Sequence, residues 1–170
     1  MGRNGVNAGR VHRAYAWAEN GQIHYRRAGP AGARSPLLLL HGLHGSSAPL
    51  EDFMSEMGRE RSVIAPDLPG TGMSDPLHGK PDAAAHAGAM LQVVAELGLG
   101  MVDVIAVKDG GEIAVEMARQ QPDVVRKIIL VSAPPPRGLL SQPTLALDMP
   151  AFPGENPDTA AAAVRDFLDH

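Results

Sequence analysis

The sequence predicts a three-layer α/β/α protein with a mostly parallel sheet of about six strands. Short apolar runs recur along the chain between Gly, Pro and Asp residues, as is typical of parallel strands buried on both faces. Segments with the apolar spacing of helices lie between these runs. Because strands alternate with helices, right-handed crossovers and one parallel sheet are expected.

The composition fits one domain and excludes several kinds of partner. The 170 residues are 44% hydrophobic, and the net charge is −4 without a basic stripe, so nucleic-acid binding is not expected. There is no cysteine, and no two His or carboxylate residues have ligand spacing, so we expect no metal site and no cofactor. No apolar run is long enough to cross a membrane, and no signal segment follows the N-terminus, so a cytoplasmic location is the default expectation.

The first half of the chain predicts a hairpin and two buried strands. Two short segments between Val11 and Arg27 flank Asn20-Gly21, a typical two-residue hairpin turn. The next expected elements are a strand at Leu37–Leu40, a helix at Leu50–Met57, a strand at Ser62–Ala65 and an irregular loop from Pro66 to Pro76.

The second half predicts two strand–helix units and then a change of character. We expect a helix at Pro81–Leu97, a strand at Val102–Val107, a helix at Gly110–Gln121 and a strand at Val125–Ser132. After Ala133 a Pro-rich break leads to one helix, Asp158–Asp169, and no further strand. The expected organisation is a flexible tail at 1–10, a core at 11–134 and a cap-like segment at 135–170.

Two loops at the carboxyl ends of neighbouring strands form the candidate site. In open α/β sheets ligands bind at this edge. The loops are His41–Ser47 and Ala106–Gly111, and free N–H groups where the following helix starts can hold an anion. The expected backbone donors are Leu43 and Asp109. The expected pocket residues are His41, Gly42, His44 and Gly110.

Three motifs together resemble the α/β-hydrolase superfamily. They are LLLLHGLHGSS, VIAPDLPGTGMSDP and VDVIAVKDGGEIAVEMARQQPDVVRKIILVSAP, and the resemblance runs from about Gln22 to Pro134. In that family the first motif supplies half of an oxyanion hole. The third contains the nucleophile elbow, a turn with small residues on either side of the nucleophile. The resemblance implies a truncated hydrolase fold and makes Leu43 and Asp109 the oxyanion-hole donors.

The chain departs from the family at the elbow. The flanking residues align Lys108 with the nucleophile, where the family usually has Ser, Asp or Cys, and Ala106 and Gly110 keep the small positions. A second register makes Asp109 the nucleophile, as in relatives that resemble dehalogenases or epoxide hydrolases, but it puts Val107 where a small residue is wanted. Lys108 and Asp109 are therefore the candidate catalytic residues. A neutral Lys108 amine could form a Schiff base or act as a base.

The family's acid and general-base His follow two further strands, which this chain does not reach. Asp148, Asp158, Asp166 and the terminal His170 match neither position. The Val125–Ser132 strand would then leave an unpaired edge that invites another strand. We expect a second copy, a separately encoded C-terminal half, or the C-terminal segment folding back to cover this edge.

Simpler roles are expected for several polar residues, and three functions stay open. His41 is expected to order its loop, and Asp67 and Asp75 to stabilise turns. The chain could be a hydrolase acting on a small ester or related carbonyl substrate with an atypical elbow residue. It could be a catalytically inactive pseudoenzyme or subunit that binds a small apolar ligand or a partner chain. It could also be a truncated gene product without activity of its own.

Overall fold

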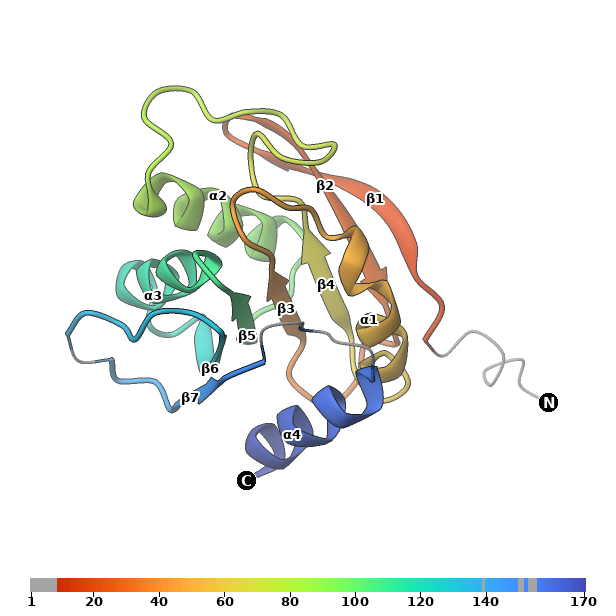
Figure 1. The fold of residues 1–170 in the computed structure, drawn as a ribbon. Coiled ribbons are helices and arrows are strands. Elements are labelled where there is room, and N and C mark those ends of the chain that lie inside the picture. The colour runs from red at the N-terminus through yellow and green to blue at the C-terminus, as the bar shows by residue number, and fades with distance from the viewer. Residues whose placement is uncertain (1–8, 139, 150–151, 153–155) are drawn as a thin grey trace.

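A seven-stranded sheet forms the centre of the computed structural model, which describes residues 9–138, 140–149, 152 and 156–170 (Figure 1). The strand order is β1-β2-β4-β3-β5-β6-β7, and only the pairs β1–β2 and β2–β4 are antiparallel. The predicted mostly parallel sheet is confirmed, with one strand more than expected. The strands are β1 (His12–Ala18), β2 (Gly21–Ala28), β3 (Leu37–Leu40), β4 (Val63–Pro66), β5 (Val102–Val107), β6 (Val125–Val131) and β7 (Thr144–Leu147).

The predicted hairpin is present, but its turn begins one residue earlier than expected. Ala18 pairs with Gly21, so Glu19 and Asn20 form the turn and Gly21 belongs to β2. Gly21 has a φ of +135°, and a Cβ at this position would lie 2.5 Å from an Asp75 carboxylate oxygen. Gly21 therefore lets the start of β2 pass close to Asp75, where a side chain would collide with the carboxylate.

Helices cover both faces of the sheet, as the α/β/α prediction requires (Figure 1). Successive strand residues point to opposite faces. Leu38 and Leu40 of β3 accordingly pack with α2 and α3, whereas Leu37 and Leu39 pack with α1 and α4. The helices are α1 (Glu51–Met57), which follows a short 3-10 turn at Ala48–Leu50, α2 (Ala83–Glu96), α3 (Gly110–Gln120) and α4 (Pro157–Asp169).

The expectation of no strand after Ala133 was wrong. β7 lies parallel to β6, with Ile128 to Val131 facing Thr144 to Leu147. Four residues that are half-exposed give little strand signal, and pairing with β6 decides their conformation. The C-terminal segment thus covers the expected open edge. A second copy or complementing chain at this side of the sheet stays a prediction, and it would now pair with β7. Residues 1–8 of the expected tail lie outside the described residues.

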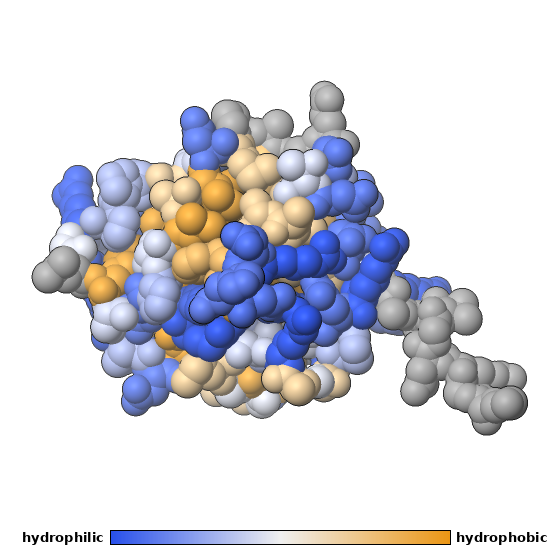
Figure 2. Space-filling model, turned by 90° about the horizontal axis from the view of Figure 1, so that it is seen from below, coloured by the Kyte–Doolittle hydropathy of each residue, from blue (hydrophilic) through white to orange (hydrophobic). Residues whose placement is uncertain are grey.

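A polar network joins α4 to the amino ends of the parallel strands. The buried Asp103 carboxylate of β5 accepts from Arg126 Nε at 2.8 Å and Nη2 at 2.6 Å. Burial raises the pKa of Asp103, against the opposing effect of Arg126 and of the buried Arg61, whose Nη1 is 3.6 Å away. Arg61 Nη2 also donates to Asp169 of α4 at 3.0 Å. Seen from below, hydrophilic side chains form a broad band beside a hydrophobic area (Figure 2).

Candidate functional site

The two candidate loops lie side by side above the neighbouring strands β3 and β5. Leu40 pairs with Ala106 at the ends of these strands. A Cβ at Gly110 would lie 2.7 Å from the His41 carbonyl oxygen, and a Cβ at Gly42 would lie 2.8 Å from Asp109 Oδ1. Both contacts are closer than real Cβ atoms tolerate, so glycine at these two positions is what allows the loops to meet.

Lys108 occupies a sharp turn between β5 and α3. Its φ is +53°, a left-handed conformation that is uncommon for any residue except glycine. The backbone fixes this turn, because Lys108 N–H donates to Val131 O at 2.9 Å and Gly111 N–H donates to Lys108 O at 3.0 Å. The strained conformation places the Lys108 side chain at the exposed rim of the turn.

The Asp109 carboxylate contacts the opposite loop instead of its own helix. Asp109 is the N-cap residue of α3, but its side chain makes no capping hydrogen bond. Oδ1 accepts instead from the Leu43 N–H at 2.9 Å. Of the two expected backbone donors, Leu43 is therefore occupied by a carboxylate. The Asp109 N–H has no protein acceptor within the described part of the chain.

His41 is held as a neutral imidazole that connects its own loop to the Pro66–Pro76 loop. The ring is buried, its Nε2 accepts from the Leu68 N–H at 3.0 Å, and Nδ1 lies 2.6 Å from Gly42 O. This pattern requires the proton on Nδ1. Thr71 Oγ1 lies 3.2 Å from Nε2. Burial lowers the pKa of His41, against the opposing effects of the Gly42 carbonyl and of Asp67 and Asp109. His41 thus orders its loop, as its sequence position led us to expect.

A cavity of about 560 Å³ lies beside these loops. Five of the expected site residues line it, namely His41, Gly42, His44, Lys108 and Asp109, while Leu43 and Gly110 are not part of its wall. Gly45, Ser46 and Val107 of the two predicted loops also line it, and the sequence did not indicate the remaining lining residues, which are Pro49, Leu50 and Phe152. Phe152 comes from the segment between β7 and α4 and packs edge-on against Phe53 of α1, with ring centroids 5.0 Å apart. Only the fold brings this aromatic ring to the site.

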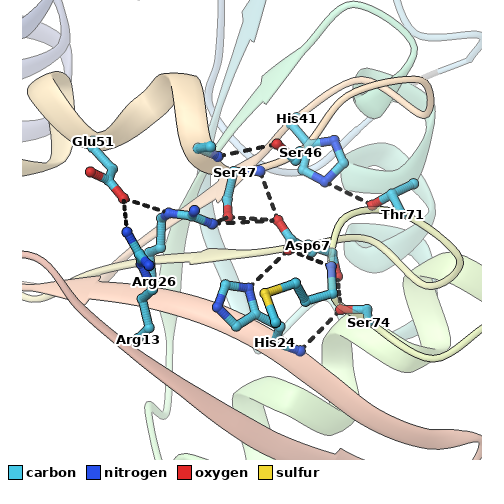
Figure 3. Close-up of polar contacts among 12 residues, drawn as sticks. Arg13, His24, Arg26, His41, Ser46, Ser47, Glu51, Asp67, Thr71 and Ser74 are labelled. Atoms are coloured by element: carbon cyan, nitrogen blue, oxygen red, sulfur yellow. Dashed lines mark hydrogen bonds and ion pairs between the residues drawn. The ribbon is translucent and has the colours of Figure 1, made fainter.

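Asp67 is the centre of a buried hydrogen-bond cluster next to the site (Figure 3). Oδ1 accepts from Ser47 N–H at 2.8 Å and from Ser47 Oγ at 2.7 Å. Oδ2 accepts from Met73 N–H at 3.0 Å and lies 2.8 Å from His24 Nδ1. Burial would raise the pKa of Asp67, but the hydrogen bonds from Ser47, Met73 and His24 lower it to about 2. The cluster fixes both loops and leaves the Asp67 carboxylate without access to a ligand.

Arg26 connects the same cluster to α1. Its Nη1 donates to Ser47 Oγ at 2.6 Å, and its Nε donates to Glu51 at 2.7 Å. Asp75, by contrast, is exposed, and the one described hydrogen bond to its carboxylate comes from the Gln22 N–H at 2.8 Å. The expected role of Asp67 and Asp75 in holding turns agrees with these contacts.

None of the other acidic or His residues considered as an acid or base contacts Lys108 among the described residues. Asp148 directly follows β7 and is exposed. Asp158, Asp166 and His170 belong to α4 or its end, and this helix packs with α1 on one face of the sheet. His86 is buried in α2, where Nδ1 lies 2.9 Å from Asp82 O. Within the described ranges, no three His or carboxylate side chains come together as a metal site would require.

The chain belongs to the α/β-hydrolase family, because the family model described as "alpha/beta hydrolase fold" matches residues 35–169. A soluble epoxide hydrolase from a Corynebacterium species is 33% identical over 142 residues, which are 79% of this chain and 49% of that protein. A 2-hydroxymuconate semialdehyde hydrolase from Pseudomonas putida is 33% identical over 103 residues, covering 58% of this chain and 36% of that protein.

Solved structures agree with this family. The epoxide hydrolase CorEH is 27% identical, with a TM-score of 0.70, over 92% of this chain and 56% of that one. The chain spans less than half the length of the curated relatives named above. No helix among the described residues is both long and apolar enough to span a bilayer.

Proposed function

We propose that the chain carries a hydrolase pocket for a small ester or related carbonyl compound, in which Lys108 takes the position of the family's nucleophile. The observation that carries this proposal is the positive φ of Lys108 in the turn between β5 and α3, beside a cavity of about 560 Å³. A strained strand-to-helix turn is the device by which this fold presents a nucleophile. The hydrolases among the chain's relatives support the same reaction class.

A lysine in this position can react in two ways with a carbonyl group. As a neutral amine it can take a proton from a water molecule that attacks the carbonyl carbon, which permits turnover. It can also attack directly. Direct attack on an ester releases the alcohol and leaves a stable amide on Lys108, whereas attack on an aldehyde or ketone releases water and leaves an imine. These routes give different products, so they can be separated by experiment.

An ester assay tests the proposal. Wild type, Lys108→Ala and Lys108→Ser would be compared with short-chain p-nitrophenyl esters, and Lys80→Ala, a substitution of an exposed lysine outside the site, serves as the control. Continuous release of p-nitrophenol that Lys108→Ala abolishes and Lys80→Ala retains supports water activation. Release equal to the amount of protein, with an acyl group on Lys108, supports direct attack. Equal rates in wild type and Lys108→Ala overturn the proposal.

Imine formation can be tested by reduction with borohydride in the presence of a small aldehyde. The sequence has three lysines, so peptide mass spectrometry can assign a label without ambiguity. Lys127 donates to the Phe167 and Leu168 carbonyl groups, and Lys80 is an exposed reference. Labelling of Lys108 in excess of Lys80 supports an imine at the site. Equal labelling of the two means that Lys108 reacts only as a surface amine.

A second candidate function is binding without turnover. It is favoured by the Asp109 carboxylate, which already occupies the Leu43 N–H that a reacting oxyanion would need. If no variant releases p-nitrophenol, but a small ester or amide raises the Tm of wild type more than that of Lys108→Ala, the pocket is a binding site. This outcome would identify the chain as a pseudoenzyme or binding subunit.

A further inference from the structure

The Leu43–Asp109 hydrogen bond has a consequence for the charge of the ligand. The contact bridges two loops, and its acceptor is an ionisable side chain that lines the cavity. Asp at an N-cap ordinarily accepts from its own helix, and here that bond is absent. The Asp109 carboxylate thus accepts from the backbone N–H of the opposite loop, which is the donor that an oxygen atom of a ligand would otherwise bind.

The rest of the pocket is suited to a small ligand that carries one oxygen group. Leu50, Val107 and Phe152 supply apolar wall, and the Lys108 side chain lies at the rim. The Asp109 N–H at the start of α3 offers a donor without a protein acceptor among the described residues. With the Asp109 side chain removed, the Leu43 N–H would join it as a second donor. Two backbone donors at the start of a helix are what binds a carboxylate.

We infer that Asp109 is a specificity-determining residue, an internal carboxylate that excludes carboxylate ligands from the pocket and leaves it open to neutral carbonyl compounds. The exclusion has two parts. Asp109 Oδ1 occupies the Leu43 N–H, and its negative charge repels a second carboxylate. This inference rests on the pocket of the proposed function. It adds that the acid released from an ester would be expelled rather than retained.

The backbone amide of Leu43 reports directly on this inference. Butyrate and its neutral analogue butyramide would be titrated into ¹⁵N-labelled wild type, Asp109→Ala and Asp109→Asn, with the Leu43 amide resonance as the readout. The Asn variant removes the charge, while its side-chain oxygen can still accept from Leu43. It therefore separates repulsion from occupation of the donor, and it serves as a second test if the Ala variant is unstable.

The expected result is that butyrate leaves the wild-type Leu43 resonance unchanged and binds Asp109→Ala at least about tenfold more tightly. The affinity for butyrate is expected to increase less in Asp109→Asn than in Asp109→Ala. The affinity for butyramide is expected to differ less among the three proteins than the affinity for butyrate. Unchanged butyrate affinity in both variants overturns the inference, as does wild-type binding of butyrate with a shift at Leu43.

The titration measures binding and needs no turnover, so its outcome is independent of the ester assay that tests the proposed function. Absence of esterase activity together with gain of butyrate binding in Asp109→Ala would reject the hydrolytic route and retain the role of Asp109. Lys108-dependent esterase activity without any gain of butyrate binding in Asp109→Ala would support the hydrolytic route and reject the role of Asp109.

Discussion

The imidazole of His24 and the carboxylate of Asp67 lie 2.8 Å apart, and both side chains are almost completely buried. The pair is part of the support beneath the site and not of its cavity, since neither residue lines that space. The Asp67 carboxylate accepts four hydrogen bonds, from β2 and two loops. Removal of the carboxylate should therefore lower the free energy of unfolding.

Asp67→Asn should lower the free energy of unfolding by about 3 kcal/mol. An amide cannot accept at both of its polar atoms, so at least one buried donor among Ser47, Met73 and His24 loses its partner. Urea denaturation measures the effect. Asp75→Asn is the matched control, because Asp75 is exposed, and it should cost less than about 1 kcal/mol. Equal costs for the two variants would contradict the assigned role of Asp67.

The same carboxylate should make the protein sensitive to acid. Because the pKa of Asp67 is lowered to about 2 from its usual 3.8, the unfolded chain binds the proton more readily than the folded one. The stabilisation is fully present above pH 3.8 and is lost as the pH falls through the window down to about 2. Unfolding free energies measured across this window should fall less steeply in Asp67→Asn than in wild type.

His41 should add a pH dependence in a higher range. Burial lowers its pKa from 6.5, so the folded protein holds the neutral ring while the unfolded chain takes up a proton. The stabilisation is complete above pH 6.5 and decreases as the pH falls from 6.5 toward the lowered pKa. His41→Gln should remove this part of the slope, and a wild-type slope retained in the variant would refute the neutral assignment.

The turn at Lys108 should carry measurable strain. Lys108→Gly and Lys108→Ala both remove the amine, but only glycine adopts a φ of +53° without steric cost. The Gly variant should therefore be more stable than the Ala variant by about 1 kcal/mol. Thermal denaturation of the two proteins gives the comparison directly. If the Ala variant is the more stable one, the turn is not strained.

Arg126 should be worth more to stability than Arg34, although both bind aspartates at the same end of the molecule. Removal of the Arg126 side chain leaves the fully buried Asp103 carboxylate with Arg61 at 3.6 Å, so Arg126→Ala should cost about 3 kcal/mol. Arg34 pairs with Asp169 on the surface, and Arg34→Ala should cost less than about 1 kcal/mol. Chemical denaturation of both variants measures the difference.

Local patterns were sufficient for most of the fold. The apolar run of β3 and the Gly-rich start of α3 each contain their own signal, and both elements lie where the sequence indicated. β7 was missed because Thr144–Leu147 becomes a strand by pairing with β6, a partner that its own four residues do not specify. Tertiary pairing overrides weak local preference.

The candidate site was predicted in its positions but not in its contacts. The structure places His41, Lys108 and Asp109 along one cavity, and their catalytic and binding roles stay predictions. No pattern in the sequence indicates that the Asp109 carboxylate turns away from its own helix toward Leu43, because that choice depends on how closely two loops approach. Phe152 was also unpredictable, since it reaches the cavity from a separate segment.

The position of α4 has a consequence for how the protein is made. Its apolar side packs with α1, about a hundred residues earlier in the chain, and Asp169 is the partner of Arg61. During synthesis on a ribosome, the sheet face beneath α4 stays exposed until that helix has emerged. Exposed apolar surface makes an incomplete chain prone to aggregation. We therefore expect nascent forms in which α4 has not yet emerged to depend on chaperones.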